Sequence, residues 1–155
     1  MRVFHSIDEL RAAAGEHLGY SSWRTVTQRE VDLFADATGD RQWIHVDPER
    51  AKAGPFGSTV AHGYLTLSLV PQLVWEVYTV EGVAMSLNYG SNRVRYPAAL
   101  PVGSRIRGGV ELLSVEPGAG GFAETLRVTV EREGGGKPAC VAETVSVLYP
   151  EPEPA

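Results

Sequence analysis

The strongest constraint on the fold is a change of hydrophobic period near Gly82. Before this residue the apolar positions recur at helical spacing, and after it they alternate with polar ones. Runs over residues 83–89, 102–115, 122–131 and 139–149 predict strands with one buried face. Glycine and proline clusters at 97–101, 117–121 and 134–138 suit hairpin connections between them. Helices followed by a run of strands indicate an α+β fold with an antiparallel sheet.

The longest predicted helix runs from His62 to about Tyr78, and apolar residues surround its axis. Such a helix is normally buried, so we expect the antiparallel sheet to curl around it. Pro71 lies inside this segment and should kink the helix or leave a carbonyl unpaired. One curled layer leaves an edge strand unprotected, which predicts a homodimer whose sheets join at an edge.

Capping residues divide the N-terminal half into shorter helices. Ser6 is a predicted N-cap, and Thr27 opens a capping box for a helix that runs to about residue 38. Gly39 is a suitable end for that helix. Asp47 followed by Pro48 predicts the start of another short helix.

Composition narrows the class of protein. The 155 residues suit one domain, 1–155, with a core over about residues 20–150. A net charge of -5 argues against a nucleic-acid binder that works through bulk charge. Cys140 is the single cysteine, which excludes an internal disulfide and favours the cytoplasm. The apolar stretch 64–80 carries too many polar residues for a membrane span, and the N-terminus lacks a secretory pattern.

The segment 37–47 carries candidate chemistry. Asp40 and His45 lie five residues apart, with the amide of Gln42 between them. If the chain leaves the helix at Gly39 as an extended loop, both groups can face one water and exchange protons with it. Asp40 could equally cap a turn, and His45 could be an ordinary half-buried histidine. A metal site that includes Asp47 is a third reading, although it lacks a third histidine at helical spacing.

Gly63 lies at the start of the predicted long helix. Its N–H has no partner within the helix and could donate to a thioester carbonyl, although the glycine could simply pack against a strand. Basic residues on the strands could contact cofactor phosphates or could form a solvated face. These residues are Arg93, Arg95, Arg105 and Arg107.

Three motifs together resemble the MaoC-like hydratases. The run 34–51, with Gly39, Asp40 and His45, resembles the hydratase motif of that family. The runs 60–65 and 94–104 resemble its second signature and its strand-and-turn element. The resemblance covers residues 26–149 and implies a single hotdog fold, in which a curled sheet wraps a long central helix.

The resemblance also implies an activity and its residues. Asp40 and His45 match the catalytic pair, and Gly63 matches the donor to the thioester oxygen. The implied reaction is the reversible syn hydration of a trans-2-enoyl thioester to an (R)-3-hydroxyacyl thioester. The expected substrate is an acyl-CoA or acyl-carrier-protein thioester, bound by a homodimer without metal or redox cofactor. Substrate contacts are expected from Gln42, His62, Tyr64 and Arg95.

Two positions depart from the family motif. Gln42 stands where asparagine is common, and Trp43 stands where proline is common, which changes the water geometry and the pocket width. A hotdog acyl-CoA thioesterase is the main alternative. Hotdog thioesterases usually place an acidic group on or near the central helix. Here that helix carries only Glu76, late in its length, so the thioesterase is disfavoured. A non-catalytic acyl-thioester-binding subunit is a further alternative.

Overall fold

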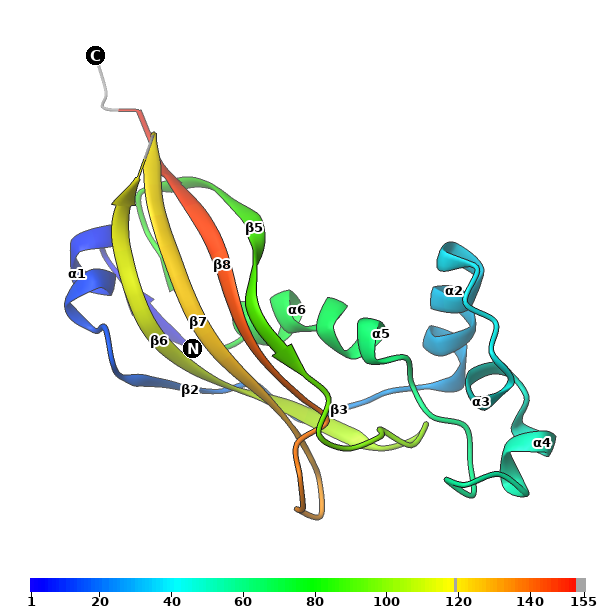
Figure 1. The fold of residues 1–155 in the computed structure, drawn as a ribbon. Coiled ribbons are helices and arrows are strands. Elements are labelled where there is room, and N and C mark those ends of the chain that lie inside the picture. Colours follow the sequence, from blue (N-terminus) through cyan, green and yellow to red (C-terminus); the bar gives the residue numbers. More distant parts are fainter. Residues whose placement is uncertain (119, 153–155) are drawn as a thin grey trace.

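The computed structural model describes residues 1–118 and 120–152, and one curled antiparallel sheet dominates it (Figure 1). The sheet order is β2-β6-β7-β8-β5, and β3 also pairs with β6. The strands predicted after Gly82 are confirmed. They are β5 (Val83–Arg95), β6 (Arg105–Gly118), β7 (Gly121–Arg132) and β8 (Cys140–Pro150). Two shorter strands of the same sheet, β2 (His17–Tyr20) and β3 (Arg24–Thr25), come earlier in the chain.

The strand β6 continues through Pro117, where the sequence predicted a break. Pro117 is paired with Phe122 beside the turn that leads into β7. On its other side, β6 pairs with β2 only as far as Glu111. Within the described residues, no strand pairs with this other side of β6 at Pro117, which is a position where a sheet tolerates proline.

The helical segment that follows residue 62 packs on the inner face of the sheet. It consists of α5 (Gly63–Ser68) and α6 (Val70–Trp75). Leu73 is fully buried and lies against Gly108 of β6, where an added Cβ would approach the Leu73 Cβ to 2.9 Å. The sheet contributes alternate residues to this core, including Leu126, Val128 and Val130 of β7.

The expected long central helix is shorter and divided. Pro71 has no N–H to donate to the carbonyl four residues earlier, and the helix is interrupted at Leu69. The second piece ends at Trp75, and Tyr78 already belongs to the strand β4 (Tyr78–Val80). Only one face of the pair is buried, because Tyr64 and Trp75 are 72% and 70% exposed.

The N-terminus closes the far end of the core. β1 (Arg2–Phe4) pairs in parallel with β4, and α1 (Ile7–Ala12) follows it. Ser6 caps α1 as predicted, since its hydroxyl accepts from the Glu9 N–H. Phe4 packs edge-on against Tyr78 with ring centroids 6.0 Å apart.

Three helices project beyond the end of the sheet (Figure 1). They are α2 (Gln28–Thr38), α3 (Trp43–Val46) and α4 (Pro48–Lys52). The predicted caps are confirmed: Thr27 and Glu30 form the capping box of α2, Gly39 ends it at φ 79°, and the Asp47 side chain caps α4. These caps fix the two ends of the segment 39–47.

The strand β5 forms an edge of the sheet. It pairs with β8, and within residues 1–118 and 120–152 no strand pairs with its other side. Met85, Leu87 and Tyr89 project from it with 48%, 45% and 80% of their surface exposed. No helix in the described part of the chain is long and apolar enough to cross a membrane.

Candidate active site

The segment after α2 is more compact than the extended loop that the sequence predicted. Residues 43–46 form the short helix α3, which turns His45 inward until only 7% of it is exposed. Trp43 points to the other side, where the Arg50 guanidinium lies 4.4 Å from its ring centre. An added Cβ at Gly54 would meet the Trp43 ring at 2.9 Å. The bulky Trp43 is thus accommodated by a glycine in the following loop.

His45 is held in one orientation. Its Nδ1 lies 2.6 Å from the Val60 carbonyl oxygen. A carbonyl can only accept, so Nδ1 carries the proton and Nε2 of the neutral ring offers a lone pair. The backbone is braced as well, because the Gln28 amide donates to the His45 carbonyl at 2.7 Å and accepts from Thr59 Oγ1 at 2.6 Å.

His62 is buried against both Asp40 and His45. Its ring stacks on His45, with centroids 3.8 Å apart and planes 23° apart. Its Nε2 donates to the Asp40 carbonyl at 2.9 Å, and only 2% of the residue is exposed. The Nδ1 atom of His62 is buried, and no residue in the described part of the chain forms a hydrogen bond with it. His62 is thus packed against both Asp40 and His45, and its substrate contact stays a prediction.

Asp40 provides the exposed half of the site. Its carboxylate lies 3.9 Å from His62 Nε2 and its side chain is 54% exposed. One polar side-chain atom from each of Asp40, His45 and His62 lies within 4.8 Å of the others. A water that accepts or donates two hydrogen bonds of about 2.8 Å can bridge groups up to about 5.6 Å apart. A single water can therefore lie between the Asp40 carboxylate and the His45 ring.

The same three residues could also surround a cation, although their arrangement suits proton transfer better. Ring lone pairs lie in the imidazole plane, so the stacked rings of His45 and His62 direct theirs side by side. One nitrogen of each ring is already engaged by a backbone carbonyl. Asp47, included in the metal reading of the sequence, instead caps α4.

Gly63 is the first residue of α5, where the helix leaves its N–H without an internal partner. An added Cβ would meet three atoms of the Tyr96 ring at 3.1 Å. Packing against the segment after β5 is thus one reason for a glycine here, and no backbone carbonyl of residues 1–118 and 120–152 accepts from its N–H.

The remaining predicted substrate residues are all exposed. Gln42 is exposed, and its backbone N–H is 3.4 Å from Asp40 Oδ1. Tyr64 is 72% exposed, with its ring 6.4 Å from that of Tyr96. Arg95 is exposed and donates to the Val94 carbonyl at 2.7 Å.

The arginines of β6 have other partners. Arg105 is paired with Glu133 at 2.7 Å, and Arg107 is paired with Glu131 at 2.8 Å. The Arg107 guanidinium also lies 4.0 Å from the centre of the Tyr20 ring. These contacts favour the solvated-face reading for Arg105 and Arg107.

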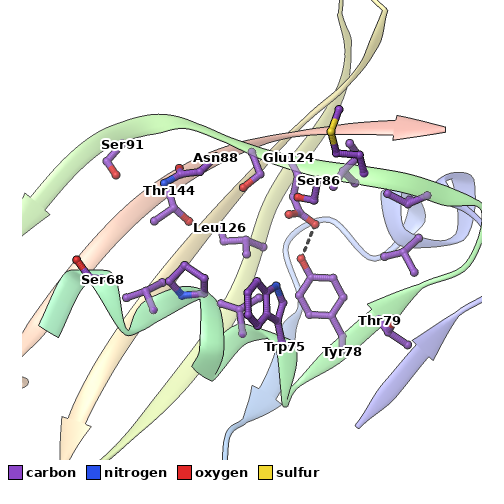
Figure 2. A pocket seen from close by; sticks show the side chains of 18 of the residues that line it. Ser68, Trp75, Tyr78, Thr79, Ser86, Asn88, Ser91, Glu124, Leu126 and Thr144 are labelled. Atoms are coloured by element: carbon purple, nitrogen blue, oxygen red, sulfur yellow. Dashed lines mark hydrogen bonds between the residues drawn. The ribbon is translucent and has the colours of Figure 1, made fainter. Parts of the chain in front are cut away.

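A pocket of about 650 Å³ lies between α5–α6 and the inner face of β5, β7 and β8 (Figure 2). Leu67 and Ser68 line its near end, one helical turn from Gly63. Glu124 projects into it and accepts a hydrogen bond of 2.5 Å from Tyr78. Burial raises the pKa of the Glu124 carboxyl, and the hydrogen bond from Tyr78 offsets only part of that rise.

Sequence reasoning missed two polar residues. Gln28 was assigned only to a helix start, and no local pattern shows that it spans to Thr59 and His45. Glu124 had a usable signal, because it shares the parity of Leu126 and Val128 on the buried face of β7. A charged residue within a buried stripe marks a position where packing alone does not explain the side chain.

The antiparallel sheet curled against a helical segment places the protein in the hotdog class of α+β folds. Residues 9–136 match the family model described as MaoC like domain. The chain is 60% identical over 146 residues to 3-hydroxyacyl-thioester dehydratase Z of Mycobacterium tuberculosis, covering 94% of this chain and 97% of that one. The protein therefore belongs to the MaoC-like dehydratase family.

Solved structures agree on the fold. A monoamine oxidase regulatory protein of Archaeoglobus superposes with a TM-score of 0.77 at 25% identity, over 97% of this chain and 98% of that one. An R-hydratase of Pseudomonas aeruginosa superposes with a TM-score of 0.71 at 22% identity, over 92% and 87% of the two chains.

Proposed function

We propose that the protein is an (R)-specific 2-enoyl thioester hydratase, which also catalyses the reverse dehydration of 3-hydroxyacyl thioesters. The observation that carries the proposal is the Asp40–His45 pair. The two groups lie within bridging distance of one water, and the Val60 carbonyl leaves the Nε2 lone pair of His45 available. Similarity to a 3-hydroxyacyl-thioester dehydratase supports the reaction class.

In the proposed mechanism, the thioester carbonyl accepts a hydrogen bond from the Gly63 N–H. This bond draws electrons from the conjugated double bond and stabilises the enolate that forms. A water between Asp40 and His45 bonds through its oxygen to carbon 3 and gives one proton to the pair. The pair returns one proton to carbon 2 on the same face. The net change is the addition of one water, and both side chains recover their starting state.

His62 and Gln28 have positioning roles in this proposal. His62 contacts both members of the pair, since it stacks on His45 and donates to the Asp40 backbone. Gln28 holds the backbone of α3 at His45. Gln42 and Tyr64 are exposed and are candidates for contact with a bound thioester, and Arg95 is a candidate for contact with the phosphates of a CoA or carrier-protein arm.

Hydration of crotonyl-CoA, measured as the loss of the enoyl-thioester absorbance, tests the proposal. Asp40→Asn and His45→Gln should each lower kcat by about 10²–10⁴-fold, the usual contribution of a positioned acid–base group. Asp36→Asn is a matched control, because Asp36 is an exposed aspartate of α2 that pairs with Arg41. Full activity in both site variants would refute the assignment. Release of free thiol with the double bond intact would show a thioesterase instead.

The homodimer is part of the proposal. The free edge of β5 and its exposed Met85, Leu87 and Tyr89 are a surface on which the same edge of a second copy would add strand pairing and bury apolar area. Equilibrium sedimentation should give twice the chain mass, and Tyr89→Lys should shift the protein toward the monomer. A monomer at micromolar concentration in the wild type would contradict it.

A further inference from the structure

The pocket beyond the site has a polar row on its sheet side. Strand pairing places Glu124 of β7 opposite Ser146 of β8, and Ser146 opposite Asn88 of β5. Directly paired residues project from the same face of a sheet. All three line the pocket, as do the apolar residues Leu126 and Val74. Figure 2 shows Glu124, Asn88 and Leu126 among these residues. The row therefore crosses the floor of a partly apolar pocket.

Burying the carboxyl of Glu124 costs free energy that an apolar side chain at this position would not cost. Only 3% of it is exposed, and among residues 1–118 and 120–152 its hydrogen bond comes from Tyr78 to one carboxyl oxygen, Oε1. No arginine or lysine pairs with it in that part of the chain. A buried carboxyl needs hydrogen-bond partners, whereas leucine at this position of the stripe would need none. The carboxyl is therefore placed to bind a polar group that enters the pocket.

The distance from the reacting centre, beside Gly63, to the polar row can be calculated along the helices and along the strand β8. Along the helices, Val74 is eleven residues beyond Gly63, which gives about 16 Å at a rise of 1.5 Å per residue. Along β8, Ser146 is five residues beyond Val141, the partner of Arg95 beside Tyr96. At about 3.3 Å per residue that is also about 16 Å. An extended chain advances about 1.2 Å per bond, so this span takes about thirteen bonds.

We propose that the pocket binds the distal part of a long acyl chain, and that the Glu124–Ser146–Asn88 row selects chains that carry a hydroxyl near their end. The inference rests on the proposed hydratase function. A hydroxyl both donates and accepts, so the carboxyl can bind it whether ionised or neutral. A plain alkyl end would leave the free oxygen of Glu124 without a partner and without water.

The test compares two substrates of equal length, trans-2-dodecenoyl-CoA and the same chain with a terminal hydroxyl. The wild type should have at least about tenfold higher kcat/KM for the hydroxylated chain, since an unpaired buried polar group discriminates on that scale. Glu124→Leu should lose or reverse this ratio. Glu116→Leu, an exposed carboxylate on β6, is the matched control and should keep the wild-type ratio.

A binding measurement on the wild type keeps the inference testable if Glu124→Leu does not fold. Calorimetry with the saturated dodecanoyl-CoA and its terminally hydroxylated form should give tighter binding of the hydroxylated chain. Equal affinity, or a preference for the plain chain, would overturn the inference. Crotonyl-CoA is too short to reach the row. Normal hydration of crotonyl-CoA without hydroxyl preference would refute this inference alone, whereas no hydration would refute the proposed function.

Discussion

Gln28 offers a prediction whose size follows from the structure. Its amide makes two half-buried hydrogen bonds, to the His45 carbonyl at 2.7 Å and from Thr59 Oγ1 at 2.6 Å, and a third, exposed one to Asp32 at 2.9 Å that should contribute little. Leucine has nearly the same shape and makes none of these bonds. At about 0.5–1.5 kcal/mol for each half-buried bond, Gln28→Leu should lower the free energy of unfolding by about 1–3 kcal/mol.

The same substitution should lower activity, because α3 would no longer be fixed where it carries His45. A displacement of about 1 Å at a catalytic group can cost about 10²-fold, so we expect kcat to fall by about 10- to 100-fold. Urea unfolding followed by tryptophan fluorescence measures the stability change, and crotonyl-CoA hydration measures kcat. A double-mutant cycle with Thr59→Val isolates one of the two bonds.

Gln72→Leu is the control for Gln28→Leu. Gln72 is an exposed glutamine on α6 that accepts from Arg24, so its loss should change the free energy of unfolding by less than about 0.5 kcal/mol. If Gln28→Leu matches this control in both stability and kcat, the bracing role of Gln28 is wrong.

Three further predictions concern the core and the helix start. Because burial raises the pKa of Glu124, its stabilising contribution is complete below about pH 4 and is lost as pH rises through the folded-state value. Glu124→Gln should therefore gain in melting temperature relative to wild type as the pH rises above the unfolded-state value of about 4, and a difference that does not change with pH would contradict this. Burial also raises the pKa of the Cys140 thiol to about 11, so a thiol reagent should label the unfolded chain and spare the folded one. Gly63→Ala should shift the Tyr96 ring, which lies 3.1 Å from the added Cβ. We expect a clear loss of kcat with only a small loss in the free energy of unfolding. Restoration of kcat by a second substitution, Tyr96→Ala, would show that the ring contact is the cause.

Local rules predicted much of the fold. Ser6, Thr27, Gly39 and Asp47 cap or end their helices as the sequence indicated, because each acts on backbone groups within a few residues. The alternation after Gly82 predicted the strands for the same reason. The length of the central helix was overestimated because the apolar residues around it continue into the strand β4, and because Pro71 divides the helix.

The candidate site was predicted less completely, since it depends on contacts between distant segments. Asp40 and His45 were identified from one motif, but the stacking of His62 on His45 joins segments seventeen residues apart in sequence. The brace from Gln28 and the pairing of Glu124 with Tyr78 have no local signature. Such residues emerge only once the sheet and the helices are placed together.

The most direct test of the central claim is hydration of crotonyl-CoA in deuterated water, with the product examined by NMR. If one Asp40–His45 pair both activates the water and returns the proton, the product should carry one deuteron at carbon 2. That deuteron should lie on the same face as the new hydroxyl, and the configuration at carbon 3 should be (R). Deuterium on both faces of carbon 2, or an (S) hydroxyl, would contradict the proposed single-site syn addition.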